Sequence, residues 1–180
     1  MGQRFRHIAD SALEPCEGTV CHHCERDDRP IFEYSGRIVD PKLAADPALA
    51  EEEPEVSELC ADCILGGNVV RDMDDRLRAL VDKLSDSRRL WREFQQLPEI
   101  PLFMQGFDWP LCCGDWCELV GCADNHRSLI ERHEQSRAWH WGPTSYRRDF
   151  RRDGAPESLR EISFFRCHHC RRETHIDQFT

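Results

Sequence analysis

The feature that most constrains this sequence is its set of closely spaced cysteines. Eleven cysteines occur in 180 residues, and most of them stand in pairs with two or three residues between them. Two cysteines at this spacing can direct both sulfur atoms at one metal ion from a single turn, and Zn²⁺ takes four such ligands in a tetrahedral array. The pairs that we take as metal ligands are Cys21/Cys24, Cys60/Cys63, Cys113/Cys117 and Cys167/Cys170.

The surroundings of these cysteines favour metal binding over disulfides. Arg4 and Arg6 are not followed by the apolar run of a secretory signal, and no stretch approaches the ~20 apolar residues of a membrane helix. We therefore expect a cytoplasmic protein that does not span a membrane, in a compartment where thiols stay reduced. An odd number of cysteines also excludes a monomer in which every cysteine forms a disulfide.

The first predicted site combines Cys21 and Cys24 with Cys60 and Cys63. The two pairs are separated by 35 residues, which exceeds the spacing of ~15 to 20 residues in ribbon-like zinc sites. Residues 41 to 57 account for the excess, because they contain three prolines and an acidic run and are predicted to form a solvated loop insertion.

The second predicted site is built on Cys167 and Cys170, whose partners must come from Cys112, Cys113, Cys117 or Cys122. Adjacent cysteines rarely share one ion, and Gly114 allows a turn that directs Cys113 and Cys117 inward. Our preferred set is Cys113, Cys117, Cys167 and Cys170, with Cys112 in place of Cys113, or a histidine ligand, as the alternatives. Four protein ligands leave no open position, so two structural zinc ions are predicted.

The remaining pattern indicates an α+β fold. Residues 31 to 34 alternate as a strand does, and residues 162 to 165 form an apolar strand before the last cysteine pair. Apolar residues at helical spacing between 72 and 94 predict one or two helices broken near 85 to 87, and another helix is predicted at 127 to 139. We predict a small zinc-stabilised domain with zinc-knuckle hairpins, short antiparallel strands and two or three helices. Residues 1 to 180 are taken as one domain, although a chain of this length can also form two small lobes.

Charge and motifs restrict the function. The net charge of −10 disfavours a general phosphate-binding surface, and the sequence contains no P-loop, GxGxxG, GxSxG or HExxH motif. We therefore predict a protein that is not an enzyme, with an enzyme of unknown type as a remaining alternative. Another alternative is a nucleic-acid-binding zinc module that uses the arginines of the C-terminal region, namely Arg147, Arg148, Arg151, Arg152, Arg166, Arg171 and Arg172.

Several motifs together resemble the CbrC family, small bacterial proteins linked by name to colicin tolerance. The resemblance is carried by Cys21-x-x-Cys24, Tyr34-Ser-Gly36, Leu59-Cys-Ala-Asp-Cys-Ile64, Trp109-Pro-Leu-Cys-Cys-Gly-Asp115 and Phe164-Phe-Arg-Cys-His-His-Cys170. It implies a metal-stabilised fold but no reaction, since none is established for the family.

Resemblance and charge together favour a tolerance or immunity-type factor whose partner is a protein, for instance a toxin. Dense negative charge speeds association with a basic active site, as in immunity proteins against cationic nucleases. Under this hypothesis, zinc holds aromatic loops and an acidic surface in place for the partner.

Overall fold

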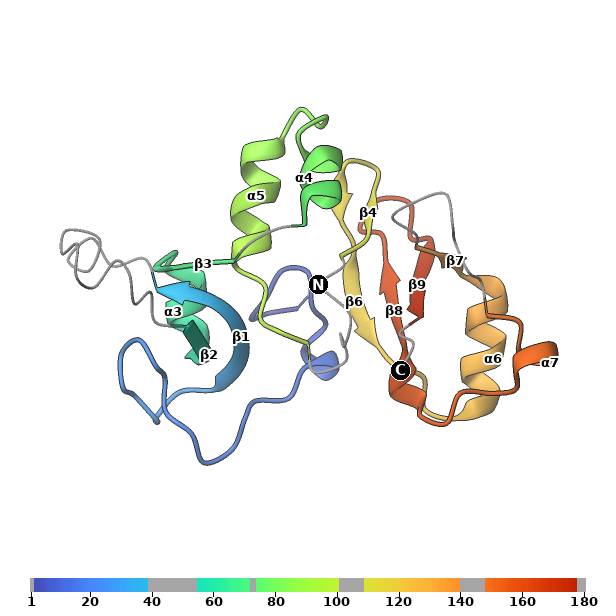
Figure 1. The fold of residues 1–180 in the computed structure, drawn as a ribbon, viewed down its shortest axis with the longest axis horizontal. Helices are drawn as coiled ribbons and strands as arrows, with labels where there is room; N and C mark the ends of the chain where they lie inside the picture. Colours follow the sequence, from blue (N-terminus) through green and yellow to red (C-terminus); the bar gives the residue numbers. More distant parts are fainter. Residues whose placement is uncertain (1, 39–54, 72–73, 101–108, 140–147, 178–180) are drawn as a thin grey trace. The chain divides into compact units, whose positions relative to one another are not determined.

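A computed structural model describes residues 2–38, 55–71, 74–100, 109–139 and 148–177 (Figure 1). The chain divides into two compact units. Glu14–Ile100 forms what we call the central unit, and Met1–Leu13 together with Pro101–Thr180 forms the terminal unit. Both units combine short strands with helices, so the predicted α+β class with antiparallel sheets is confirmed.

The central unit contains a three-stranded sheet in the order β2-β1-β3. Strand β1 (Ile31–Ile38) pairs antiparallel with β2 (Glu55–Cys60) and with β3 (Val69–Val70). The register of β1 and β2 shifts between Glu33 and Gly36, as it does at a β-bulge. A side chain at Gly36 would lie 2.4 Å from the carbonyl oxygen of Val70, so only glycine allows β3 to approach here.

The described part of the central unit also contains three helices. Helix α3 (Ala61–Leu65) begins directly after β2, and α4 (Asp75–Val81) begins at the Asp74 side chain, which accepts a hydrogen bond from the Arg76 backbone N–H. Helix α5 (Ser87–Gln95) comes next, so the break predicted near 85 to 87 is confirmed. The apolar spacing places Leu77, Val81, Leu90 and Phe94 in the core.

The terminal unit is organised around a four-stranded sheet in the order β6-β8-β9-β7. Strands β6 (Glu118–Gly121), β8 (Ile162–Arg166) and β9 (Glu173–Asp177) pair antiparallel, whereas β7 (Arg137–Ala138) runs parallel to β9. A separate hairpin joins β4 (Leu111–Cys112) to β5 (Asp115–Trp116).

The N-terminal segment belongs to this terminal unit. Ile8 forms a parallel bridge with Leu119 of β6, and the 3-10 helix η1 (Asp10–Ala12) follows it. The backbone N–H of Ala9 donates to Leu119 O at 2.9 Å, and Leu119 N–H donates to His7 O at 2.8 Å. Gly2–Leu13 is therefore attached to a strand that comes more than ~100 residues later in the chain.

Helix α6 (His126–Gln135) packs its apolar side against the sheet of the terminal unit. It begins with a capping box in which Asn125 and Ser128 exchange side-chain and backbone hydrogen bonds. Leu129 of α6 then joins a core cluster with Ala123, Ile162 and Phe164. Helix α7 (Phe150–Asp153) and the 3-10 helix η2 (Leu159–Glu161) follow before β8.

Several expectations differ from the structure or lie outside the described residues. The predicted loop insertion at 41 to 57 is too long, because Glu55 already begins β2; residues 41 to 54 lie outside the described part. More helices form than the two or three predicted, since α3 and α7 are too short to show a periodic pattern. No helix of the described residues has the length and apolar character that crossing a membrane requires.

Two leucines of α4 provide a test of the central core. Leu77 is fully buried, whereas Leu80 on the same helix is 38% exposed. We expect Leu77→Ala to lower the free energy of unfolding by about 2–5 kcal/mol, because it removes buried methyl groups and leaves a cavity. The matched control Leu80→Ala should change it by less than ~1 kcal/mol. Urea denaturation of the metal-loaded protein measures both, and equal effects would contradict this packing.

Candidate metal centres

The central unit brings together the four cysteines that the sequence predicted for its first site. The sulfur atoms of Cys21, Cys24, Cys60 and Cys63 all lie within 4.8 Å of one another. Cys24 Sγ and Cys60 Sγ are 3.8 Å apart. Two ligands at 2.3 Å from a tetrahedral zinc ion are separated by about 3.8 Å, whereas a disulfide would hold its sulfurs at about 2.05 Å. The group thus has the dimensions of a metal site.

Secondary structure explains how distant cysteines meet in the central unit. The pairing of β1 with β2 sets Ile31 opposite Cys60, and α3 starts at the next residue, so its first turn carries Cys63 back beside Cys60. Cys16 also bridges to Ile31, but its sulfur is not part of the group.

The two Cys-His-His-Cys turns share one backbone pattern. Cys21 N–H donates to Arg26 O at 2.9 Å, and Cys167 N–H donates to Arg172 O at 3.0 Å. The residue after each turn, Glu25 or Arg171, donates its N–H back to the first cysteine and has positive φ. Cys170 N–H also points at Cys167 Sγ, at 3.5 Å. Hydrogen bonds from the backbone of His23 and Cys24 reach the Cys21 thiol, so both turns direct backbone N–H groups toward sulfur.

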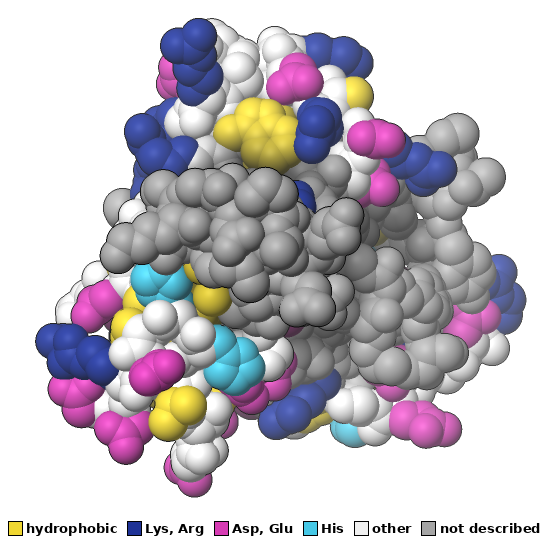
Figure 2. Space-filling model, turned by 60° about the vertical axis from the view of Figure 1, so that its left-hand side comes forward, with side chains coloured by type: hydrophobic (Ala, Val, Ile, Leu, Met, Phe, Trp, Pro, Cys, Tyr) yellow, Lys and Arg dark blue, Asp and Glu magenta, His cyan; other side chains and the backbone are white. Residues whose placement is uncertain are grey.

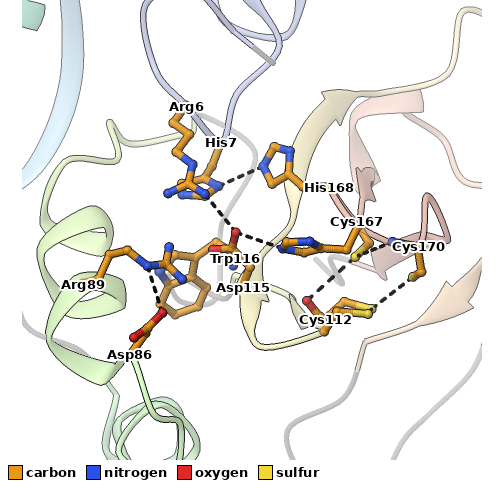
Figure 3. Close-up of polar contacts among 12 residues, drawn as sticks. Arg6, His7, Asp86, Arg89, Cys112, Asp115, Trp116, Cys167, His168 and Cys170 are labelled. Atoms are coloured by element: carbon orange, nitrogen blue, oxygen red, sulfur yellow. Dashed lines mark hydrogen bonds and ion pairs between the residues drawn. The ribbon is translucent and has the colours of Figure 1, made fainter.

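The second group lies in the terminal unit and contains Cys112, Cys113, Cys167 and Cys170. Cys112 Sγ is 3.8 Å from Cys113 Sγ and 3.7 Å from Cys170 Sγ, again the spacing of tetrahedral ligands. Figure 3 shows Cys112 from the β4–β5 hairpin facing Cys167 and Cys170 at the end of β8.

A tight hairpin allows adjacent cysteines to share this site. Cys112 pairs with Asp115, which leaves Cys113 and Gly114 as a two-residue loop. Both loop residues have positive φ, 54° and 77°, which is the mark of a type I′ turn. The chain reverses so sharply here that Cys112 and Cys113 both reach the sulfurs of the Cys167 turn.

The structure differs from our preferred set at Cys117. This residue lies beyond β5, is completely buried, and is outside the group of sulfurs. Its carbonyl oxygen accepts a hydrogen bond from Trp109 Nε1 at 2.8 Å, and burial raises the pKa of its thiol to about 12. Cys117 is thus a core residue in this fold, and Cys112 stands in the group of four where we had predicted Cys117.

Electrostatics within each group disfavours four thiolates in the absence of a cation. In the central group, burial and the neighbouring thiols raise the pKa of Cys63, while backbone N–H groups overcome the effect of burial at Cys21 and lower its pKa to about 7. In the terminal group, burial and neighbouring thiols raise the pKa of Cys112, and a backbone N–H from Arg172 helps to lower that of Cys170 to about 7. Four thiolates this close repel one another unless a positive ion lies among them.

The histidines inside the turns contact groups around the cysteines and belong to neither group of four. His23 Nδ1 lies 3.3 Å from Cys63 Sγ, and His22 Nε2 lies 2.8 Å from Glu58. In the terminal unit, His168 Nε2 is 3.1 Å from His7 Nδ1 (Figure 3). Such outer contacts orient the ligands of a metal site.

Asp115 lies in β5 and is nearly buried. Its carboxylate accepts from Arg6 Nη2 at 3.0 Å (Figure 3) and lies 3.4 Å from His169 Nε2. Asp115 thereby connects the N-terminal segment to the Cys167 turn, a role that no local sequence pattern reveals.

Most described arginines of the C-terminal region are paired with carboxylates. Arg148 contacts Glu161 at 2.8 Å, and Arg166 contacts Glu173 at 2.9 Å. Arg152 contacts Asp153 at 2.7 Å, while Arg171 and Arg172 are exposed. Arg147 and the side chain of Arg151 lie outside the described residues. These ion pairs reduce the positive charge available to a nucleic acid.

In comparisons with known proteins, no family model, curated protein or solved structure matches this chain significantly. The resemblance to the CbrC family therefore stays a prediction. The two groups of four cysteines, each of which could hold a metal ion, are the firmest functional features of the chain.

Cysteine substitutions distinguish the observed set from the preferred one. Cobalt bound by thiolates absorbs strongly through sulfur-to-metal charge transfer, so its intensity counts metal–sulfur bonds. We expect Cys112→Ser to lower this absorption by roughly half, because the altered site no longer holds its cobalt ion, and Cys117→Ser to leave it unchanged. Cys16→Ser is the matched control with a cysteine outside both groups. Loss of signal in Cys117→Ser with retention in Cys112→Ser would restore the original set.

Proton release on metal binding tests the thiol electrostatics. The pKa values of Cys60 and Cys63, and likewise of Cys112 and Cys113, are raised, so these thiols hold their protons at pH 8 in the metal-free protein. Metal binds thiolates, so we expect at least two protons to leave per ion at pH 8. Calorimetry in two buffers with different ionisation enthalpies measures this number. Release of fewer than one proton per ion would contradict the raised pKa values.

Proposed function

We propose that this chain is a non-enzymatic zinc-binding protein, in which one structural zinc ion holds each unit and exposed surfaces bind a protein partner. The observation that carries the proposal is the pair of four-cysteine groups, whose sulfurs lie within 4.8 Å of one another and include separations of 3.7 to 3.8 Å that match tetrahedral zinc. Zinc suits four soft thiolates better than a hard cation does. The two Cys-His-His-Cys turns would then be zinc knuckles.

The proposed zinc ions would act on stability. Cys21, Cys24, Cys60 and Cys63 would hold one ion, and Cys112, Cys113, Cys167 and Cys170 the other. Four protein ligands complete the coordination of zinc, so such an ion joins chain segments and leaves no position for a water nucleophile. Each ion would connect segments that are remote in the sequence, and the binding energy would contribute directly to folding.

The charge distribution supports a basic partner. The central unit holds 21 acidic and 11 basic residues, so it carries the whole net charge of −10, whereas the terminal unit holds 13 of each. Figure 2 shows acidic side chains gathered at the lower left of one face. Glu25, Asp27, Asp28 and Asp62 are exposed residues close in sequence to the first cysteine group. A zinc ion on four thiolates would add a further charge of about −2.

A tolerance or immunity-type role fits this charge. A cationic nuclease toxin has a basic active site for nucleic acid, and an acidic protein can be attracted to it over long range. The resemblance to the CbrC family supports the same role through the link of that family with colicin tolerance. The ion pairs of Arg148, Arg152 and Arg166 count against the alternative of a nucleic-acid-binding module.

Binding to cationic toxin nuclease domains tests this proposal. We expect the zinc-loaded chain to bind such a domain, and the association rate to fall by roughly ten-fold or more between 50 mM and 500 mM salt, because salt screens the attraction. The triple variant Glu25→Gln, Asp27→Asn, Asp28→Asn should slow association at low salt. The matched control is Asp124→Asn with Glu134→Gln and Glu157→Gln, which neutralises three exposed carboxylates of the terminal unit and should have little effect.

Two results would overturn the proposed partner. One is a failure to bind any toxin domain tested together with a failure to protect cells from those toxins. The other is tight, salt-dependent binding to DNA or RNA, which would favour the nucleic-acid alternative.

A further inference from the structure

A third group of metal-binding side chains lies in the terminal unit, apart from the cysteines. His175 and Asp177 are two residues apart on β9, so both side chains point to the same face of the sheet. His133 of α6 meets them there, with its ring 4.1 Å from the ring of His175. A nitrogen of each histidine and a carboxylate oxygen of Asp177 all lie within 4.8 Å of one another.

Burial makes this cluster unusual. The side chains of His133 and Asp177 are 2% and 5% exposed, and His175 is fully buried. Two imidazoles and a carboxylate are costly to bury unless they are paired or coordinate a metal ion. The ring of Phe150 lies against that of His133, and the ring of Phe164 lies near that of His175. On these sides of the histidines, water cannot take the place of a metal ion or a paired group.

Hydrogen bonds around Ser136 favour a proton on Nδ1 of His175. Ser136 Oγ lies 2.6 Å from the carbonyl oxygen of Arg132 and 3.4 Å from that of His133, and both can only accept its proton. The same oxygen lies 2.7 Å from His175 Nδ1, which is the donor of that hydrogen bond when the hydroxyl proton is on a carbonyl. The lone pair of His175 is then on Nε2. Metal-binding histidines typically have this arrangement, with the second nitrogen donating to an outer partner.

The contact between His133 and Asp177 has the dimensions of two ligands. His133 Nε2 and Asp177 Oδ2 are 3.4 Å apart, which is longer than the usual 2.7–3.2 Å of such a hydrogen bond. Two nitrogen or oxygen ligands at about 2.1 Å from a tetrahedral ion are separated by about 3.4 Å. Within the described residues, the other carboxylate oxygen, Asp177 Oδ1, is buried without a hydrogen bond of normal geometry, and the backbone N–H of Arg148 also acts on this carboxylate. A metal ion would satisfy it.

We propose that His133, His175 and Asp177 form a third metal site, which takes a divalent first-row transition-metal ion on nitrogen and oxygen ligands. Its chemistry differs from that of the cysteine groups, because two imidazoles and one carboxylate suit Zn²⁺, Fe²⁺ or Co²⁺ and lack the preference of thiolates for soft ions. Three protein ligands also leave at least one coordination position for another ligand.

Cobalt serves as the probe. Full-length protein with zinc on its cysteines is first treated with a chelator too weak to remove thiolate-bound zinc, and is then titrated with Co²⁺. We expect one Co²⁺ per chain by native mass spectrometry, with weak visible bands and no sulfur-to-cobalt charge transfer. Asp177→Asn keeps the shape of the side chain but removes its charge, and should weaken Co²⁺ binding at least ~10-fold. His133→Gln should do the same.

Controls separate this site from the cysteine groups and from a purely structural role. His126→Gln changes a histidine of the same helix, outside the cluster, and should leave Co²⁺ binding unchanged. Nitrogen chemical shifts of His175 give an independent readout in the unaltered chain: Nδ1 should be protonated, and the Nε2 signal should shift or broaden with Co²⁺. The proposal is overturned if the unaltered chain binds no Co²⁺ outside its cysteines. Equal Co²⁺ binding by Asp177→Asn and His133→Gln would overturn it as well.

Discussion

Four thiolates within 4.8 Å of one another repel unless a cation lies among them, and both units of this protein contain such a group of sulfur atoms. Burial and the neighbouring thiols raise the pKa values of Cys63 and Cys112, whereas Cys21 and Cys170 ionise near neutral pH. Much of the fold serves to bring these sulfurs together. The β1–β2 pairing does so in the central unit, and the β4–β5 hairpin and the end of β8 do so in the terminal unit.

The first cysteine group could be predicted from the sequence because each of its two cysteine pairs has the two-residue spacing of a metal-binding turn. The second group could not be predicted completely. The I′ turn at Cys113 and Gly114 depends on the pairing of Leu111 with Trp116, and a preference against adjacent cysteine ligands does not foresee so tight a reversal. Helices long enough to show a repeating apolar pattern could be predicted, whereas α3 is a short helix that begins where β2 ends.

The sequence alone did not predict that His133, His175 and Asp177 form a cluster, although each of them is a residue type that binds metal ions. His175-x-Asp177 is a same-face pair only if the segment is a strand, and His133 approaches it only because α6 packs on that side of the sheet. If this chain catalyses a reaction, we expect it at such a metal site, because three protein ligands leave a coordination position open. The charge of the central unit and the third metal site lie in different units, so partner binding and metal exchange would occupy separate parts of the chain.

The discontinuity of the terminal unit affects how the protein is made. Residues Glu14–Ile100 form a continuous stretch, so the central unit can fold as soon as it leaves the ribosome. Ile8 and Ala9, in contrast, are synthesised early but pair with Leu119, and the cysteines at 167 and 170 come later still. The terminal unit must therefore wait until the residues through Cys170 have been made, and Ile8 and Ala9 stay without their strand partner until Leu119 has been made.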